Sequence, residues 1–164
     1  MTRILLPKAP PFGIFGSLLE MADSSALHAV IFRVGTLLCA APAGIVREIL
    51  PALPATRIPG VADSVSGLVN VRGSLLTVLD GFRLLGQQRN NEEGALLVLT
   101  ARGRTFGLAV GEVRDFVELT PGSVADQARL PGVDPGVVSA VARRDDEHFI
   151  LLNLDALVGP VFGS

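Results

Sequence analysis

The sequence predicts an all-β protein built from two similar modules in one chain. An internal repeat is the first reason: residues 35–50 read GTLLCAAPAGIVREIL and residues 103–117 read GRTFGLAVGEVRDFV, with an offset of 67 residues over the shared Val-Arg-acid segment. A second pair of similar blocks runs from Gly67 to Asp80 and from Gly136 to Asp155. The third reason is a series of short apolar segments separated by turn residues, which is typical of barrels or sandwiches.

The first module contains five predicted strands, and the third segment, residues 45–50, reads as one helical turn that leads into a strand. Gly35 marks the turn of an opening hairpin, and Pro51 ends the third strand, which is too close to Gly44 for a long helix. Gly73 stands where a tight turn needs a positive φ, so the last two strands form a second hairpin. These strands are residues 28–34, 37–41, 45–50, 65–71 and 74–79.

The second module repeats this plan after a possible helical turn at residues 82–85. Residues 87–94, the most polar stretch of the chain, are the natural linker, and residues 145–147 form a charged hairpin tip. The predicted strands are residues 95–100, 104–110, 113–119, 136–142 and 149–154.

The domain organisation follows from the extent of the repeat. We expect an N-terminal tail at residues 1–26, with a short helical possibility at 16–21, and a C-terminal tail at 159–164. The domain at 27–158 divides into intertwined subdomains at about 27–90 and 91–158. Because about 65 residues give marginal stability through burial alone, the subdomains should unfold as one unit.

Composition excludes several classes of protein. Hydrophobic residues make up 49% of the 164 residues, which supports a folded core, and only 18% are charged, so partner proteins could cover some of the apolar surface. The net charge of -2, the pI near 5.6 and the absence of Trp and Tyr argue against a nucleic-acid binder.

Nothing in the sequence predicts membrane insertion or secretion. Pro, Gly or a charged residue interrupts every apolar stretch before it reaches the roughly 18 residues that a spanning helix needs. The N-terminal segment does not read as a signal peptide, and Cys39 is the single cysteine, so we expect a cytoplasmic protein. Cys39 lies in an apolar run and should be a buried, unreactive side chain.

A longer series of motifs resembles the CheW family of bacterial chemotaxis adaptors. The resemblance covers about residues 28–158, and its most specific element is Gly-x-x-Asn-x-Arg-Gly at residues 67–73, in register with the upstream Val-Arg-Glu-Ile. The motifs are AAP at 40–42, VREIL at 46–50, IPG at 58–60, GLVNVRG at 67–73, VLD at 78–80, RTFGLAV at 104–110 and EV at 112–113.

The resemblance implies two SH3-like five-stranded β-barrel subdomains, with short helical turns and a hydrophobic groove between the barrels. It also implies a scaffold without catalytic residues, cofactor or metal. The expected partners are the cytoplasmic tip of a methyl-accepting chemoreceptor and the regulatory domain of a CheA-type histidine kinase, with self-association in membrane-attached receptor arrays. By position, the receptor-binding groove would involve Val46, Glu48, Gly67, Asn70, Arg72, Gly73, Gly107 and Val113.

Four positions depart from the family pattern. Cys39 replaces a common aromatic, Thr77 a frequent proline, Gly81 a usual leucine and Gly111 a frequent aspartate. The departures leave two pathways open: standard chemotaxis, or a divergent array in which the chain is a stand-alone interaction module for pili or surface sensing.

Arg72 and Glu48 give the sharpest hypothesis about the site. A guanidinium can hold a carboxylate with two hydrogen bonds and still offer donors to a visiting helix. The alternative is an ion pair that only fixes the turn. For Asn70, next to this turn, the simplest role is to satisfy backbone groups.

Two other readings of the acidic residues are weaker. Asp80 and Asp155 end corresponding blocks and could form an aspartic-protease dyad, but neither is followed by a hydroxyl residue, so capping of the next turn is the default. The acidic tip at 145–147 has too few ligands for a cation site, and His28 and His148 lack the spacing of a metal site.

Overall fold

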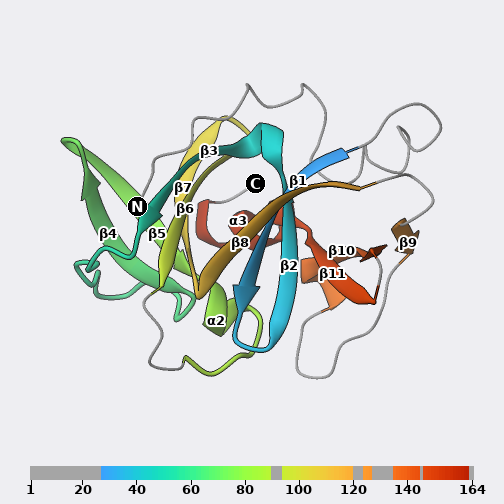
Figure 1. Ribbon diagram of the computed structural model, residues 1–164. Coiled ribbons are helices and arrows are strands. Elements are labelled where there is room, and N and C mark those ends of the chain that lie inside the picture. Colours follow the sequence, from blue (N-terminus) through green and yellow to red (C-terminus); the bar gives the residue numbers. More distant parts are fainter. Residues whose placement is uncertain (1–26, 90–93, 120–123, 127–134, 145, 163–164) are drawn as a thin grey trace.

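The computed structural model describes residues 27–89, 94–119, 124–126, 135–144 and 146–162 (Figure 1). The expected N-terminal tail, including its possible helix at 16–21, lies outside these residues. So do residues 90–93 of the predicted linker and Asp145 of the predicted hairpin tip.

Eleven strands and a few short helices make up the described part of the chain. All ten predicted strands are present, and so are the two predicted helical turns, at η1 and α2. In order, the elements are β1 (Leu27–Val34), β2 (Leu37–Pro42), η1 (Ala43–Ile45), β3 (Val46–Pro51), β4 (Val65–Val71), β5 (Ser74–Asp80), α2 (Gly81–Leu84), β6 (Ala95–Ala101), β7 (Arg104–Val110), β8 (Glu112–Leu119), β9 (Val124–Asp126), η3 (Pro135–Val137), β10 (Val138–Arg144), β11 (Glu147–Leu152) and α3 (Leu154–Phe162).

The helix α3 was not predicted from the sequence. The last strand ends at Leu152 instead of residue 154, and the helix continues past the expected start of a C-terminal tail at residue 159. Gly159 and Pro160 are poor helix formers, which hides the helix in the sequence. Leu154 and Leu157 are buried in the core, and this tertiary contact outweighs the local preference.

The strands form two mixed sheets that exchange hairpins. One sheet has the order β3-β6-β7-β5-β4, and the other has the order β8-β1-β2-β11-β10-β9. The hairpin β1–β2 from the first half of the chain therefore belongs to the sheet of the second half, while β6–β7 from the second half completes the sheet of the first. The all-β prediction with two β modules is confirmed, although the short β9 gives one sheet a sixth strand.

The exchange is symmetric. β1 pairs antiparallel with β8 as β6 pairs with β3, and β2 pairs parallel with β11 as β7 pairs with β5. Both copies of the Val-Arg-acid motif carry a register shift at the arginine, Arg47 in β3 and Arg114 in β8. The repeat in the sequence thus encodes the same irregularity, a β-bulge, at the same place in each sheet.

The second pair of repeated blocks aligns differently from the sequence-based match. The backbone N–H of Asp80 donates to the carbonyl of Ser64 at 2.7 Å, and that of Asn153 donates to Val137 at the same distance. The structural counterpart of Asp80 is therefore Asn153, at an offset of 73 residues, and not Asp155. Each of the two side chains accepts a hydrogen bond from the first turn of the following helix.

Three apolar clusters lie on the faces of the two sheets. Neighbouring residues alternate between clusters: Leu79 faces the largest cluster and Val78 a small one, while Phe32 faces the largest cluster and Ile31 a third. The largest cluster contains residues of both sheets together with α2 and α3. It fills the space between the sheets and binds them into one body.

The five-stranded sheet also connects its two edge strands. The chain that leaves β3 pairs with β4 through an isolated bridge, in which Thr56 and Leu68 exchange two backbone hydrogen bonds of 2.8 and 2.9 Å. β3 and β4 are the outermost strands in the sheet order, so this bridge curves the sheet towards a barrel.

The shared core and the exchanged hairpins predict a single unfolding transition. Neither half of the chain can leave without removing two strands from the other sheet, so calorimetry should give equal calorimetric and van't Hoff enthalpies. Two separated transitions would contradict this prediction.

Cys39 provides a prediction about alkaline pH. The residue is fully buried, and burial raises the pKa of its thiol. In the unfolded chain the thiol loses its proton above about pH 8.5, while the folded state keeps it, so stability is lost as the pH rises.

The measurement is urea unfolding between about pH 9 and 10.5, where no tyrosine titrates because the chain has none. The free energy of unfolding should fall by about 1.4 kcal/mol per pH unit more steeply than in Cys39→Ala. Equal slopes in the two proteins would show that the thiol is not protected.

Candidate functional site

The structure divides the eight predicted groove residues between the two sheets and between interior and surface. Seven belong to the five-stranded sheet or to its β4–β5 turn, and Val113 lies on β8 of the other sheet. The exposed ones are Asn70, Arg72 and Gly73; Val113 is half-buried; and Val46, Glu48, Gly67 and Gly107 are buried.

Glu48 and Arg72 form the predicted ion pair, and its position in the sheet explains its geometry. Both guanidinium Nη atoms of Arg72 donate to the two carboxylate oxygens of Glu48. The Glu48 side chain is only 6% exposed, whereas that of Arg72 is 54% exposed. Glu48 comes from β3 and Arg72 from the turn that directly follows β4, so the pair ties the two edges of the sheet together.

The turn that carries Arg72 is held in an unusual backbone conformation. Arg72 and Gly73 both have positive φ angles, 50° and 86°, as a two-residue type I′ hairpin requires. The left-handed region is unfavourable for arginine. Oδ1 of Asn70 accepts the backbone N–H of Gly73 at 2.8 Å, so the structural role expected for Asn70 is present.

The ion pair also changes the chemistry of Arg72. The hydrogen bond to Glu48 raises the pKa of the Arg72 guanidinium. The side chain is therefore a permanent cation whose Nη atoms reach inward to a buried carboxylate. The guanidinium has further N–H donors that the two bonds to Glu48 do not use, and with the side chain 54% exposed another protein can reach the group.

Gly67 and Gly107 support the fold from inside. Gly67 has a φ of +143°, and a Cβ atom there would lie 2.1 Å from the carbonyl oxygen of Thr56, where the chain crosses β4. A Cβ on Gly107 would lie 2.8 Å from Cδ1 of Leu96 in the small apolar cluster. Gly67 therefore needs glycine because backbone lies against it, whereas a side chain at Gly107 would require the end of the Leu96 side chain to move.

Two exposed apolar residues beside these positions were missed by the sequence analysis. Leu75 is 69% exposed and pairs directly with Asn70 across the β4–β5 hairpin. Phe116 is 48% exposed on β8, although its repeat counterpart, Ile49, is buried. For Leu75 a signal existed: strand alternation places it on the opposite face from Leu76.

Asp80 and Asp155 do not form a catalytic dyad. Oδ1 of Asp80 accepts the backbone N–H of Phe82 at 2.9 Å and lies 3.2 Å from Nη2 of Arg89. Asp155 is in the first turn of α3 and lies 3.4 Å from Nε of Arg102. The two carboxylates thus pair with different arginines. The capping role expected for both residues is confirmed for Asp80 and wrong for Asp155, because Asn153 accepts the N–H of Ala156 at the start of α3.

Neither a metal cluster nor a membrane helix is found in the part of the chain that the structure describes. No three His, Cys, Asp or Glu side chains there come together in a way that could hold a metal ion. Among the same residues, no helix is long and apolar enough to cross a bilayer.

Comparison with known families identifies the fold. Residues 28–160 match the CheW-like domain family, close to the stretch of 28–158 expected from the motifs. The chain belongs to the CheW-like domain family. CheW-like domains are non-catalytic scaffolds of chemosensory signalling that interact with other chemosensory proteins, so the prediction that the chain is not an enzyme is confirmed.

Two similar proteins place the chain within this family. It is 37% identical to Protein PilI of Pseudomonas aeruginosa over 84 residues, which are 50% of this chain and 47% of that relative. The crystal structure of the scaffolding protein TtCheW from Thermoanaerobacter tengcongensis has a TM-score of 0.75 and 21% sequence identity. That match covers 85% of this chain and 96% of TtCheW. At this identity the likeness to TtCheW concerns the fold.

The role of Gly67 in this CheW-like fold can be tested against a matched glycine. Gly103 also has a positive φ, +74°, but no atom lies within 4 Å of where its Cβ would be. Gly103→Ala should therefore lower the free energy of unfolding by about 1 kcal/mol. Gly67→Ala adds a backbone clash and should cost about 3 kcal/mol or more. Equal costs, measured by urea unfolding, would contradict the close crossing.

Proposed function

We propose that this chain is the coupling scaffold of a divergent chemosensory array, of the kind that controls pili or surface sensing. Its partners there are the helical cytoplasmic tip of a receptor and the regulatory domain of a CheA-type histidine kinase. The observation that carries the proposal is the exposed face of the β4–β5 hairpin. At its turn it carries Arg72, which is held by a buried carboxylate, and at the start of β5 it carries the exposed Leu75, paired with Asn70 of β4.

The chemistry of this face suits a receptor helix. Leu75 offers an apolar anchor, Asn70 offers a polar group opposite it in the hairpin, and Arg72 offers a cation at the turn; apolar anchors with polar groups around them are usual in protein interfaces. The Glu48 pair and the Asn70 hydrogen bond hold the hairpin in place before binding. A preorganised surface loses less entropy on association, so a small contact can still be specific.

The eight residues carried over from the family then act in two ways. Asn70, Arg72 and Gly73 contact the receptor, with Val113 at the margin on the other sheet. Val46, Glu48, Gly67 and Gly107 are buried, so they shape the surface from beneath. Substitution of a buried member would weaken binding by displacing the hairpin, and it would lower stability as well.

Signal transfer in this proposal needs no chemistry in the scaffold. A receptor state that binds the scaffold differently shifts the population of the kinase states joined to it, because the binding equilibria are linked. The two mixed sheets share one core, so they can act as a rigid connection between two partners.

The choice of pathway rests on the likeness to Protein PilI. That likeness, at 37% identity, favours a divergent array over standard chemotaxis. The four departures from the family pattern are consistent with a partner that differs from an ordinary chemotaxis receptor. Standard chemotaxis is the second candidate, and the kinase that co-purifies with the chain distinguishes the two.

The binding surface can be tested with Arg72→Ala and Leu75→Ser. Each should weaken binding to the cytoplasmic tip of the receptor encoded with this chain by about tenfold, the size expected when an interface anchor is lost. Isothermal titration calorimetry measures the affinity, and urea unfolding of the same samples reports on the fold.

Leu53→Ser is the matched control, because Leu53 is also exposed, at 39%, but belongs to the segment after β3. It should bind the receptor tip as the unaltered chain does. If the Arg72 and Leu75 variants remain folded and also bind normally, the hairpin is not the receptor surface.

A further inference from the structure

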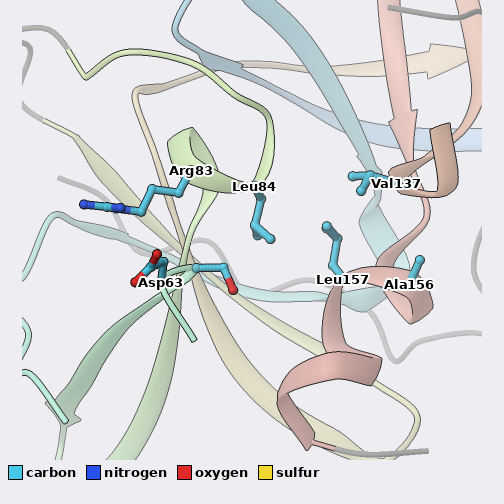
Figure 2. Close-up of a pocket in the computed structure, with 7 residues that line it drawn as sticks. Asp63, Arg83, Leu84, Val137, Ala156 and Leu157 are labelled. Atoms are coloured by element: carbon cyan, nitrogen blue, oxygen red, sulfur yellow. The ribbon is translucent and has the colours of Figure 1, made fainter. Parts of the chain in front are cut away.

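A second candidate binding site lies between helices α2 and α3. The pocket has a volume of about 480 Å³ and is lined by Asp63, Ser64, Arg83, Leu84, Val137, Ala156 and Leu157 (Figure 2). None of the eight predicted groove residues is among them. An inference about this pocket is therefore independent of the receptor surface proposed above.

The pocket lies where the two halves of the repeat meet. The offset of 73 residues that relates Asp80 to Asn153 also relates Ser64 to Val137, and it relates Arg83 and Leu84 to Ala156 and Leu157. Equivalent positions from both halves thus surround one space. The pocket follows from the duplicated architecture and is not an accident of one loop.

The two halves of the pocket have diverged in chemistry. The first half of the chain contributes the polar side chains Asp63, Ser64 and Arg83, whereas the second contributes the apolar Val137, Ala156 and Leu157. Figure 2 shows Leu84, Leu157 and Val137 directed towards a common space, with Arg83 and Asp63 together at one side. The lining is therefore apolar at one wall and charged at the other.

Arg83 is the charged group best able to receive a ligand. Its Nε is 3.8 Å from Oδ2 of Asp80, beyond hydrogen-bond distance, and its side chain is 62% exposed. Asp80 is already satisfied by the backbone N–H of Phe82 and by Arg89. A carboxylate that approaches the pocket can therefore engage the guanidinium of Arg83 without breaking a short ion pair.

The secondary structure around the pocket limits how a partner could bind. The lining residues come from the turn before β4, from α2, from η3 and from α3, and none belongs to a strand. No strand lines the pocket, so strand addition is not favoured there, and a helix lying in the groove is the alternative mode of binding that we consider. The Asp63 carboxylate lies on the same side as Arg83 and repels an acid, so the partner's carboxylate must reach the guanidinium on the side away from Asp63.

We propose that this pocket binds a helical segment of a partner protein that presents a leucine-sized apolar side chain with a carboxylate one turn away. The apolar side chain packs against Leu84, Val137 and Leu157, and the carboxylate pairs with Arg83. An apolar partner without the acid, or one with a basic residue in its place, is a poorer match to this rim.

The test uses a capped, alanine-based helical peptide of about 15 residues with Leu and Glu four positions apart. Titration into the ¹⁵N-labelled full chain should shift the amide signals of residues 63–64, 83–84, 137 and 156–157 in a saturable way, with a dissociation constant of about 1 mM or tighter. Replacement of the peptide Glu by Lys should weaken binding about three- to tenfold.

Charge reversal in the protein distinguishes a specific contact with Arg83 from non-specific peptide binding. Arg83→Glu should invert the preference, so that the Lys peptide binds more tightly than the Glu peptide. Arg104→Glu, at an exposed arginine that does not line the pocket, should leave the preference unchanged. Ala156→Leu should fill the pocket and weaken both peptides.

Three results would overturn the proposal. These are shifts that appear outside the pocket, equal affinity for the Glu and Lys peptides, and no saturable shift at several millimolar peptide. Amide signals far from the pocket report whether each variant is folded. The receptor titration of the preceding section is unaffected by any of these outcomes, so the two ideas can fail separately.

Discussion

The exchange of hairpins between the two sheets is the constraint on which the rest of the structure depends. Each sheet needs a hairpin from the other half of the chain, so its hydrogen bonding and its apolar face are complete only when both halves are folded. The largest apolar cluster then joins the inner faces of the sheets with α2 and α3. The chain consequently offers its partners a single rigid body, and the outer surfaces keep fixed positions relative to each other.

The β4–β5 hairpin shows how a buried interaction can shape an exposed surface. Glu48 is nearly inaccessible, but it holds Arg72 at the tip of the β4–β5 hairpin and keeps that hairpin against the opposite edge of the sheet. The segment after β3 is also held against β4, because Thr56 pairs with Leu68 and its carbonyl packs closely over Gly67. The eight family positions therefore have different roles. The buried ones stabilise the barrel, and the exposed ones are accessible to another protein.

Local patterns allowed much of this fold to be predicted from the sequence. Apolar runs between glycines and prolines gave all ten predicted strands, and the Arg72-Gly73 turn followed from the need for positive φ. Intertwined subdomains were expected, but which hairpins are exchanged could not be predicted, because strand pairing between distant segments leaves no local signal. Helix α3 was hidden by Gly159 and Pro160, and the Asp80–Asp155 match was misleading because the counterpart of Asp80 is an asparagine. The exposure of Leu75 did leave a local signal, because strand alternation separates it from the buried Leu76.

The symmetric exchange has a consequence for how such a protein can diversify. Its strand pairing is that of a domain-swapped homodimer whose two subunits have been fused into one polypeptide. In a homodimer every substitution appears twice, so the two ends of the molecule must remain identical. Fusion removes that restriction: Ile49 can stay in the core while Phe116 becomes a surface residue, and Arg83 can face Ala156. One chain can thereby present unlike faces to unlike proteins, which a symmetric pair of subunits cannot do.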